Sequence, residues 1–431
     1  MSAAGAMLGG RTFRSLRDHR NYRLWFSAQV ISVSGTWMQN TAQAWLVLQL
    51  TGSPRAVGLL VACQFGPFAV LGLAGGVLSD RLDRRRALLL TQSLPILFAG
   101  TLAVLAATQQ ATVWQVYLLA ALNGLVQVLD TPARQAFTVE MVGRDELPNA
   151  IALNSSIFNA SRIIGPGLAG VIIATAGVAA CFALNALSYV AVVAALLLMR
   201  RSELFPVKTG HPAMVRGIVD GLRYAAHTPR VRLVLLLMLV VGTISINFSV
   251  VLPVVASVTL HSGPQTLGLL SASFGLGALA GALVCASLAR ADVRALILGA
   301  AGLGLTELLL APQTNIVATA ALLVVCGMCF TTYTANSNST IQVTVPDRLR
   351  GRVLAMYAYF FFGTAPIGGY LTGLLAERGG TRLALGVAGA TALVSAALGG
   401  LWWAHERGIW LSAGRAATAT NEGDRTGALQ R

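Results

Sequence analysis

The sequence contains few charged residues. Only 11% of its 431 residues are Asp, Glu, Lys or Arg, whereas 55% are apolar and the mean hydropathy is +0.69. A soluble domain carries about 25% charged residues, because its surface must meet water. A shortfall of this size indicates that most of the surface meets lipid. The composition therefore excludes the soluble, collagen-like, disordered and disulfide-scaffold classes of protein.

Lysine is almost absent, and histidine and cysteine are scarce. Lys208 is the single lysine, so the net charge of +15 comes from arginine. The five histidines lie outside the apolar runs, and the five cysteines lie inside them, where a thiol behaves as a small apolar group. Cys326 and Cys329 form a CxxC pair, but no second pair of ligands accompanies them. We therefore expect no metal site, no disulfide framework and no cofactor.

Several catalytic motifs are also missing. The sequence contains no HExxH or GxSxG motif and no P-loop. An enzyme embedded in the membrane would need a nucleophile with a base, or a metal cluster, at mid-depth. The sequence therefore predicts neither an enzyme nor a primary pump.

Apolar runs dominate the chain, and twelve of them are long enough to cross a bilayer as helices of about 20 residues. The polar stretch 201–230 divides them six and six. We therefore expect an all-α integral membrane protein with two six-helix halves, 22–200 and 231–404. The segment 1–21, the linker 201–230 and a disordered tail, 405–431, are predicted to be cytoplasmic. The runs lie at 22–50, 55–79, 87–108, 112–139, 149–175, 178–200, 231–259, 264–289, 294–312, 315–343, 352–376 and 383–404.

Basic residues are distributed unequally between the two sides of the predicted membrane. The loops on one side contain just three of them, Arg55, Arg378 and Arg382. The positive-inside rule therefore places both termini in the cytoplasm. We interpret the basic excess as a topological signal and a contact with anionic lipid headgroups, not as a nucleic-acid surface. No cleaved signal peptide is expected.

The linker has an amphipathic pattern between residues 215 and 223. Val215, Ile218 and Leu222 follow helical spacing, and Arg216 and Arg223 lie on the other face. This pattern predicts a helix on the inner membrane surface. The alternative is a linker that is merely solvated.

The two predicted halves share an internal repeat. A shift of 203 residues superimposes four positions of the loop and helix after the fourth run on the same unit after the tenth run. Duplicated six-helix halves are the organisation of major facilitator transporters. The matched pairs are Val142 with Val345, Ala152 with Ala355, Gly165 with Gly368, and Gly170 with Gly373.

The loop between the second and third runs contains a charged motif. It reads Gly76-Val-Leu-Ser-Asp80-Arg81-Leu-Asp83-Arg84-Arg85, which resembles the major facilitator signature G-x-L-x-D-R-x-G-R-R, with Asp83 in place of a glycine. The resemblance implies a gating loop in which arginines pair with nearby acids. Glu140, at the end of the fourth run, is the expected partner of Arg84. The alternative is that the arginines are only a positive-inside signal.

The fifth run contains a second motif. Gly165-Pro166-Gly-Leu-Ala169-Gly170 is similar to the G-P-x-x-G-G element of drug:proton antiporters, with Ala169 in place of one glycine. Proline removes a helical hydrogen bond and small residues allow close contact, so we expect a bend against a neighbouring helix.

Further sequence around these motifs narrows the resemblance. Asn159-Ala-Ser-Arg162, Asp130-Thr-Pro132-Ala-Arg134 and Gly35-Thr-Trp37-Met-Gln39 resemble the major facilitator subfamily of the enterobactin exporter and the macrolide efflux pumps. The resemblance covers all twelve runs. It implies export of small organic molecules across the bacterial cytoplasmic (inner) membrane, driven by the proton gradient. One departure is Ala120, where many proton antiporters have an arginine four residues before a glycine, here Gly124.

Three charged residues are predicted well inside the membrane: Asp130, Arg162 and Glu307. Such groups are costly in lipid and usually face a cavity or a partner. Asp130 and Arg162 lie at similar depths in neighbouring helices, so we expect them to form an ion pair. Two interpretations remain open, a protonation switch for transport and a static pair that locks two helices. Glu307 lies near the outer end of its run, where it could reach water, and is a further proton carrier candidate.

Polar residues form a stripe on the first run. Ser32, Thr36, Gln39 and Gln43 recur every three or four residues. We expect the stripe to face a central substrate cavity, to which Asn247, Phe248 and Asn336 of the second half contribute. Hydrogen bonding between helices is the alternative for each amide.

These features together predict a secondary exporter of siderophore-like or drug-like molecules that works by alternating access. Its expected partners are a small-molecule substrate, protons and membrane lipids, and we expect a monomer. An importer or uniporter of the same fold is the main alternative. A membrane receptor or scaffold without transport activity is a further one.

Overall fold

The computed structural model describes the backbone of residues 13–205, 214–288 and 292–428. Gly76, Asp80 and Arg81 of the charged motif have side-chain positions outside the described residues. The same holds for Val215 and Ile218 of the apolar face predicted in the linker, whereas its third member, Leu222, is described and exposed. Within these backbone ranges, the structure does not describe the side chains of residues 73–74, 76–77, 79–81, 214–219, 288 and 407–428.

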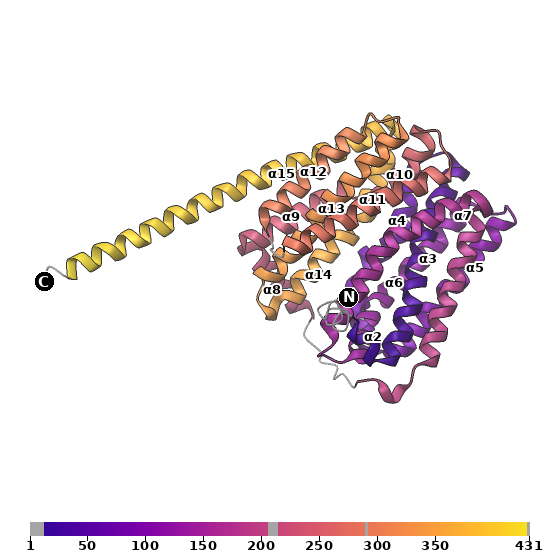
Figure 1. The fold of residues 1–431 in the computed structure, drawn as a ribbon, viewed down its shortest axis with the longest axis horizontal. Coiled ribbons are helices and arrows are strands. Elements are labelled where there is room, and N and C mark those ends of the chain that lie inside the picture. The colour runs from indigo at the N-terminus through magenta and orange to yellow at the C-terminus, as the bar shows by residue number, and fades with distance from the viewer. Residues whose placement is uncertain (1–12, 206–213, 289–291, 429–431) are drawn as a thin grey trace, which may run out of the picture.

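The described chain is helical and forms two groups of helices, which lie side by side in Figure 1. A 3₁₀ turn, Arg201–Glu203, and helix α8, Met214–His227, lie between the groups in sequence. The first group comprises α2 (Arg14–Asp18), α3 (Arg20–Thr51), α4 (Pro54–Arg81), α5 (Arg84–Ala107), α6 (Val113–Val142) and α7 (Leu147–Leu198). The second comprises α9 (Pro229–Ile244), α10 (Phe248–Val254), the π-helix Val255–Thr259, α11 (Pro264–Leu288), α12 (Val293–Leu310), α13 (Ile316–Thr344), α14 (Asp347–Gly363) and α15 (Ala365–Ala428).

Nine helical segments of the described chain are long and apolar enough to cross a membrane. Two of the nine contain a glycine with positive φ, Gly177 in α7 and Gly380 in α15. Glycine adopts this left-handed conformation without the clash that a Cβ would cause. Both breaks fall between two of the predicted runs, so each long segment holds more than one run.

The structure interrupts two runs that the sequence predicts as continuous. α9 ends at Ile244 before α10 begins, because the Asn247 side-chain amide donates to the Thr243 carbonyl at 2.7 Å and to the Ile244 carbonyl at 3.2 Å. α14 ends at Gly363, three residues before Pro366 in the first turn of α15. Proline has no N–H to continue a helix, and it disfavours helical backbone at the residue before it.

Two matched glycines of the internal repeat, Gly170 and Gly373, lie at equivalent contacts between the two groups. A Cβ on Gly170 of α7 would lie 2.6 Å from the Cα of Gly268 in α11. A Cβ on Gly373 of α15 would lie 3.1 Å from the Cα of Gly58 in α4. Both crossings therefore need glycine, since any larger residue would separate the helix backbones.

The crossing of α4 and α15 lies at the end of the molecule where α3 ends and α4 begins, which we call the closed end. Polar residues reinforce this crossing. The Ser53 hydroxyl donates to Glu377, the Arg55 backbone N–H donates to the same carboxylate at 3.2 Å, and the Arg55 guanidinium donates to the Tyr370 hydroxyl at 2.8 Å. Ser53 and Arg55 belong to the first group, and Tyr370 and Glu377 to the second. These contacts join the groups at the closed end.

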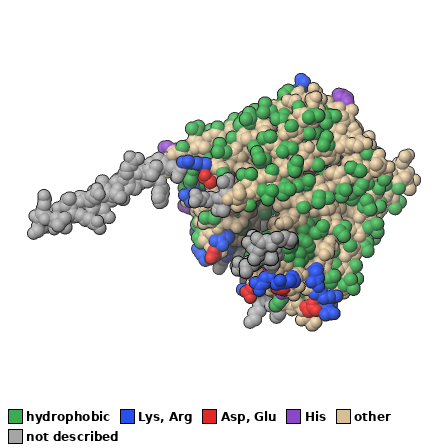
Figure 2. Space-filling view, in the orientation of Figure 1, with side chains coloured by type: hydrophobic (Ala, Val, Ile, Leu, Met, Phe, Trp, Pro, Cys, Tyr) green, Lys and Arg blue, Asp and Glu red, His purple; other side chains and the backbone are tan. Residues whose placement is uncertain are grey.

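The two groups diverge toward the opposite end, which we call the terminal end because the first described helix, α2, and helix α8 lie there (Figure 1). Contacts between the groups run along α4 from Pro54 to Ala69, whose carbonyl accepts from the Tyr359 hydroxyl. They run along α7 from Gly170 to Arg162. Figure 2 shows charged side chains gathered at the terminal end, whereas the flank of the molecule in that view is largely apolar.

The sequence predicts disorder in the C-terminal segment from residue 405, and this stays a prediction. The backbone of α15 continues as a helix to Ala428 and projects away from both groups (Figure 1). The segment 412–419 is rich in alanine, the strongest helix former, and contains no proline. The division of the chain into domains, including the membrane-surface position of the linker helix, stays a prediction.

Candidate functional site

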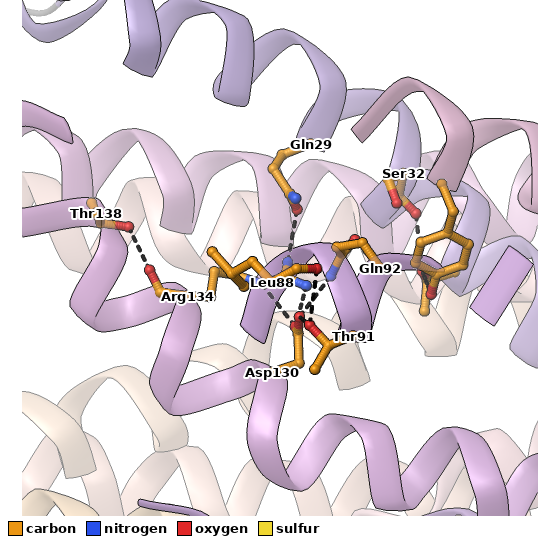
Figure 3. Close-up of polar contacts among 10 residues, drawn as sticks. Gln29, Ser32, Leu88, Thr91, Gln92, Asp130, Arg134 and Thr138 are labelled. Carbon is orange, nitrogen blue, oxygen red and sulfur yellow. Dashed lines mark hydrogen bonds and ion pairs between the residues drawn. The ribbon is translucent and has the colours of Figure 1, made fainter. Parts of the chain in front are cut away.

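Asp130 lies at the centre of a buried polar network on α3, α5 and α6 (Figure 3). The residue is 1% exposed. One carboxylate oxygen accepts from the Thr91 hydroxyl at 2.7 Å and from the Gln92 amide at 2.6 Å. The other accepts from Arg134 Nη2 at 2.5 Å and Nε at 3.1 Å. We call Gln29, Thr91, Gln92, Asp130 and Arg134 the Asp130 network.

Arg134 connects this network to α3. Its Nη1 atom donates to Gln29 Oε1 at 2.7 Å, and its guanidinium lies 5.9 Å from the Trp25 ring centroid. Arg134 was named above only as part of a motif and was not expected as a partner of Asp130. The signal was present, because Asp130 and Arg134 are four residues apart on one helix and therefore adjacent on its surface.

The expected ion pair between Asp130 and Arg162 is not formed, so that expectation was wrong. Four donors already surround the Asp130 carboxylate, and the nearer cation, Arg134, takes the place predicted for Arg162. Equal depth was a weaker guide than position on the helix surface, because depth says nothing about the direction in which a side chain points.

Arg162 instead lies among aromatic rings from both groups. Its guanidinium carbon is 5.6 Å from the ring centroid of Trp37 on α3, 5.9 Å from that of Phe274 on α11 and 4.9 Å from that of Phe330 on α13. These distances are within the range of cation–π interactions. Arg162 thus lies at the junction between the two groups.

The described part of the charged motif forms the predicted contact. Arg84 Nη1 lies 2.6 Å from Glu140 Oε1, which joins the start of α5 to the end of α6. Arg85 donates to the Leu196 carbonyl at 2.6 and 3.0 Å, near the end of α7, where a cation complements the helix dipole. Asp83 accepts from the Arg86 backbone N–H at 2.8 Å and caps α5. This cap is a physical reason for an aspartate where the family signature has glycine.

Glu307 is buried, contrary to the expectation that it could reach water. It is 1% exposed on α12, and neither of its carboxylate oxygens has a hydrogen-bond partner among the described residues. Ser245 and Cys326 lie beside it. A charged carboxylate without partners is costly in such a place, so the neutral acid suits this site.

The polar stripe of α3 is engaged within the first group. Gln39, 4% exposed, accepts from the Asn185 amide at 2.8 Å, and Thr36 lies 3.0 Å from the Tyr189 hydroxyl. Gln43 is 2% exposed. Hydrogen bonding between helices, the alternative that the sequence left open, therefore describes Gln39 and Thr36 here. Their role in substrate binding stays a prediction.

The cavity candidates of the second group are also buried. Asn247 ends α9 as described above, and the Phe248 ring lies 4.4 Å from that of Phe274. Asn336 donates to the Thr332 carbonyl at 2.9 Å and accepts from the Asp292 backbone N–H at 3.3 Å. Phe248 therefore continues the row of rings around Arg162, whereas the two asparagines stabilise helix ends.

The small residues of the second motif make the close contacts that the sequence predicts. A Cβ on Gly165 would lie 2.5 Å from Trp37 Cβ and 2.7 Å from the Ser34 carbonyl oxygen of α3. Pro166 lies inside α7. Gly170 forms the crossing with α11. The motif thus places α7 against both groups, and the bend at Pro166 stays a prediction.

Comparison with known proteins identifies the family. A family model described as transmembrane secretion effector matches residues 11–404. The chain belongs to this family. It is therefore a major facilitator transporter of the efflux type and not an enzyme, as the charged motif and the glycine motif indicated.

Two relatives and one solved structure illustrate the resemblance of this transporter to others. It is 29% identical to the multidrug efflux pump Tap of Mycolicibacterium fortuitum over 370 residues, which cover 82% of this chain and 88% of the relative. It is 30% identical to the enterobactin exporter EntS of Salmonella typhi over 275 residues, which cover 64% and 65% of the two chains. An inward-facing, unoccupied bacterial homologue of the lysosomal transporter Spinster matches with a TM-score of 0.70 and 12% identity, over 89% of this chain and 97% of the other.

Proposed function

We propose that this transporter is a secondary exporter of small organic molecules that works by alternating access and is driven by proton antiport. The observation that carries the proposal is the arrangement of its two groups of helices, which are joined at the closed end and diverge toward the terminal end. Its relatives include proteins named for efflux and export.

The proposal includes a membrane topology. The chain crosses the bacterial cytoplasmic membrane twelve times as two six-helix halves, and both termini lie in the cytoplasm. Support comes from the basic residues, which are scarce in the loops at the closed end, and from the repeat glycines, which occupy equivalent crossings. On this topology the terminal end is cytoplasmic, and the structure corresponds to an inward-open form. We also propose that the basic terminal end contacts anionic lipids and that the transporter is a monomer.

Two carboxylates are the candidate proton carriers. Asp130 is held by four hydrogen-bond donors, two of them on Arg134, so both of its carboxylate oxygens are occupied in the present form. Glu307 has no such partners and suits a bound proton in the present form. We therefore favour Glu307 as the group that carries a proton in this conformation, and Asp130 as one that is exposed by a rearrangement of α6.

The proposal is tested with purified protein in vesicles that carry an imposed pH gradient. The probes are ethidium, erythromycin and 1-naphthoate, each followed by its accumulation against its own concentration gradient. Proton antiport predicts that at least one probe accumulates on the acidic side and that a pH-sensitive dye reports a matching proton flux in the opposite direction. An ionophore that collapses the gradient should abolish accumulation. If the probes move at a rate that does not depend on the pH gradient, antiport is contradicted and a uniporter is favoured. If a probe accumulates toward the cytoplasmic side, an importer is favoured.

A further inference from the structure

Arg162 is a cation inside a predicted membrane-spanning run, and it has no acidic partner among the described residues. Its guanidinium contacts the rings of Trp37, Phe274 and Phe330, and none of the ion pairs of the described chain includes it. The ring faces attract its positive charge. A guanidinium, however, has five N–H donors in a planar fork, and its strongest complement is a bidentate carboxylate.

The two acidic residues that the sequence predicts inside the membrane do not pair with Arg162. Asp130, the residue expected to neutralise Arg162, is held by Arg134, Thr91 and Gln92. Glu307 is buried inside the second group beside Ser245 and Cys326. Arg162 therefore keeps its donors free for an acceptor that is not part of the described chain.

The position of Arg162 suits contact with a transported molecule. It lies where the two groups of helices begin to diverge, with Trp37 contributed by the first group and Phe274 and Phe330 by the second. Phe158 and Ser155 follow on the same face of α7, one and two turns closer to the terminal end, and both are exposed. A molecule that enters from the terminal end would therefore pass exposed side chains of α7 before it reaches the guanidinium.

The surrounding rings restrict the type of ligand. Phe158 packs edge-on against Trp37 with 5.7 Å between centroids, and Phe330 lies 5.6 Å from Phe274, so aromatic surface lies on both sides of the guanidinium. A carboxylate would take the N–H donors, and an attached ring would pack against these aromatic side chains. A simple inorganic anion would use the charge and leave the aromatic surface without a contact.

We propose that Arg162 binds the acidic group of the transported molecule and that the substrates are small organic acids whose carboxylate adjoins an aromatic or similarly apolar body. The proposal rests on the proposed transport function, since it assigns the substrate class to the same path between the two groups. Arg162 then acts in substrate recognition and not as the counter-ion of Asp130. Because its rings belong to both groups, a bound acid contacts both sides of the junction that must rearrange during alternating access.

A binding experiment with two matched probes tests this assignment. The full chain in lipid nanodiscs is titrated with 1-naphthoate and with 1-naphthamide, which share the ring and differ in the charge of the substituent. Charge-assisted hydrogen bonds predict that the wild-type protein binds 1-naphthoate about 10- to 100-fold more tightly than 1-naphthamide. Arg162→Gln should bring the two affinities to within about threefold of each other, because the amide affinity changes little.

Matched variants separate recognition from folding. Arg86→Gln removes an exposed arginine of the first turn of α5 and should leave the preference unchanged. Arg162→Lys keeps the charge but loses the planar fork, so it should lower the preference for 1-naphthoate without abolishing it. If Arg162→Gln does not fold, Arg162→Lys replaces it in the titration. Equal affinity of the wild-type protein for the two probes overturns the proposal, and so does a preference that survives in Arg162→Gln.

The binding experiment needs no pH gradient, so its result does not depend on whether the proposed antiport is correct. A chain that binds 1-naphthoate through Arg162 but accumulates no probe against a gradient contradicts the antiport and supports the role of Arg162. A chain that shows proton-driven export but no preference for the carboxylate contradicts the role of Arg162 alone.

Discussion

Arg134 binds Asp130 from one helical turn away, with Nη2 2.5 Å and Nε 3.1 Å from the same carboxylate oxygen. The pair lies in the first group of helices, where Thr91, Gln92 and Gln29 complete its hydrogen bonds. An ion pair with this many partners holds α3, α5 and α6 together. It also leaves Arg162 available at the junction between the groups.

Substitution of Asp130 by Asn should destabilise the transporter. The amide cannot neutralise Arg134, and loss of one partner of a buried ion pair costs up to about 3–5 kcal/mol. The loss should fall below that range because 29% of the Arg134 side chain is exposed. The measurement is thermal unfolding in detergent. Thr91→Val, which removes one neutral donor, is the control and should cost about 1 kcal/mol; equal melting temperatures of wild type and Asp130→Asn would contradict this role.

Arg84→Ala should lower stability without changing substrate preference. The Arg84–Glu140 pair joins two helices of one group, and hydrogen bonds to a charged partner contribute about 1.5–3 kcal/mol. Thermal unfolding should show the loss, and Glu140→Gln should show a similar one. Arg86→Ala in the same helical turn is the control. If Arg84→Ala and Arg86→Ala melt alike, the pair has no stabilising role.

Glu307→Gln should uncouple transport from the pH gradient while the protein stays folded. The glutamine side chain has nearly the shape of the neutral acid that this buried site favours, but it cannot take up or release a proton. The vesicle assay described above measures the coupling, and thermal unfolding checks the fold. Pyranine-detected proton flux that equals the wild-type value would exclude Glu307 as the carrier.

Acidification should weaken the closed end. The hydrogen bond from the Ser53 hydroxyl, with the Arg55 backbone N–H and charge, lowers the pKa of Glu377 below its ordinary value of 4.5. A carboxyl group with a lowered pKa stabilises the folded form above its ordinary pKa, and this contribution is lost as the pH falls through the lowered value. The difference in melting temperature between wild type and Glu377→Gln should therefore be largest above pH 4.5 and vanish in more acidic solution. A difference that is constant with pH would show that the Glu377 charge has no such role.

Gly58→Ala should open the closed end, because its Cβ would overlap the Gly369 carbonyl oxygen of the other group. The reporter is thiol labelling of Thr372→Cys in a chain whose five native cysteines are replaced, since Thr372 is buried near this crossing. Labelling should become faster. Gly66→Ala in the same helix has nothing within 4 Å of its new Cβ and should label like the parent chain. Similar rates for the two variants would argue against a tight crossing at Gly58.

Much of the fold could be predicted from the sequence, because each helix position depends on local properties. Long apolar runs specify helices wherever lipid replaces water, since the backbone must satisfy its hydrogen bonds internally. The repeat glycines also marked the crossings, as any crossing of two backbones at close range needs a residue without a Cβ. The Arg84–Glu140 contact was predicted from a motif whose members lie at the ends of neighbouring helices.

The partners that the buried charges meet on other helices were decided only by the tertiary structure. Sequence assigns a depth to Asp130 and Arg162, but the rotation of each helix about its axis decides which neighbour a side chain meets. That rotation turns Asp130 toward Thr91 and Gln92 of α5, and it turns Arg162 toward rings from both groups. It likewise turns Gln39 toward Asn185 and encloses Glu307 within the second group. Packing over the whole bundle sets these rotations, because each helix must bury side chains against several neighbours at once.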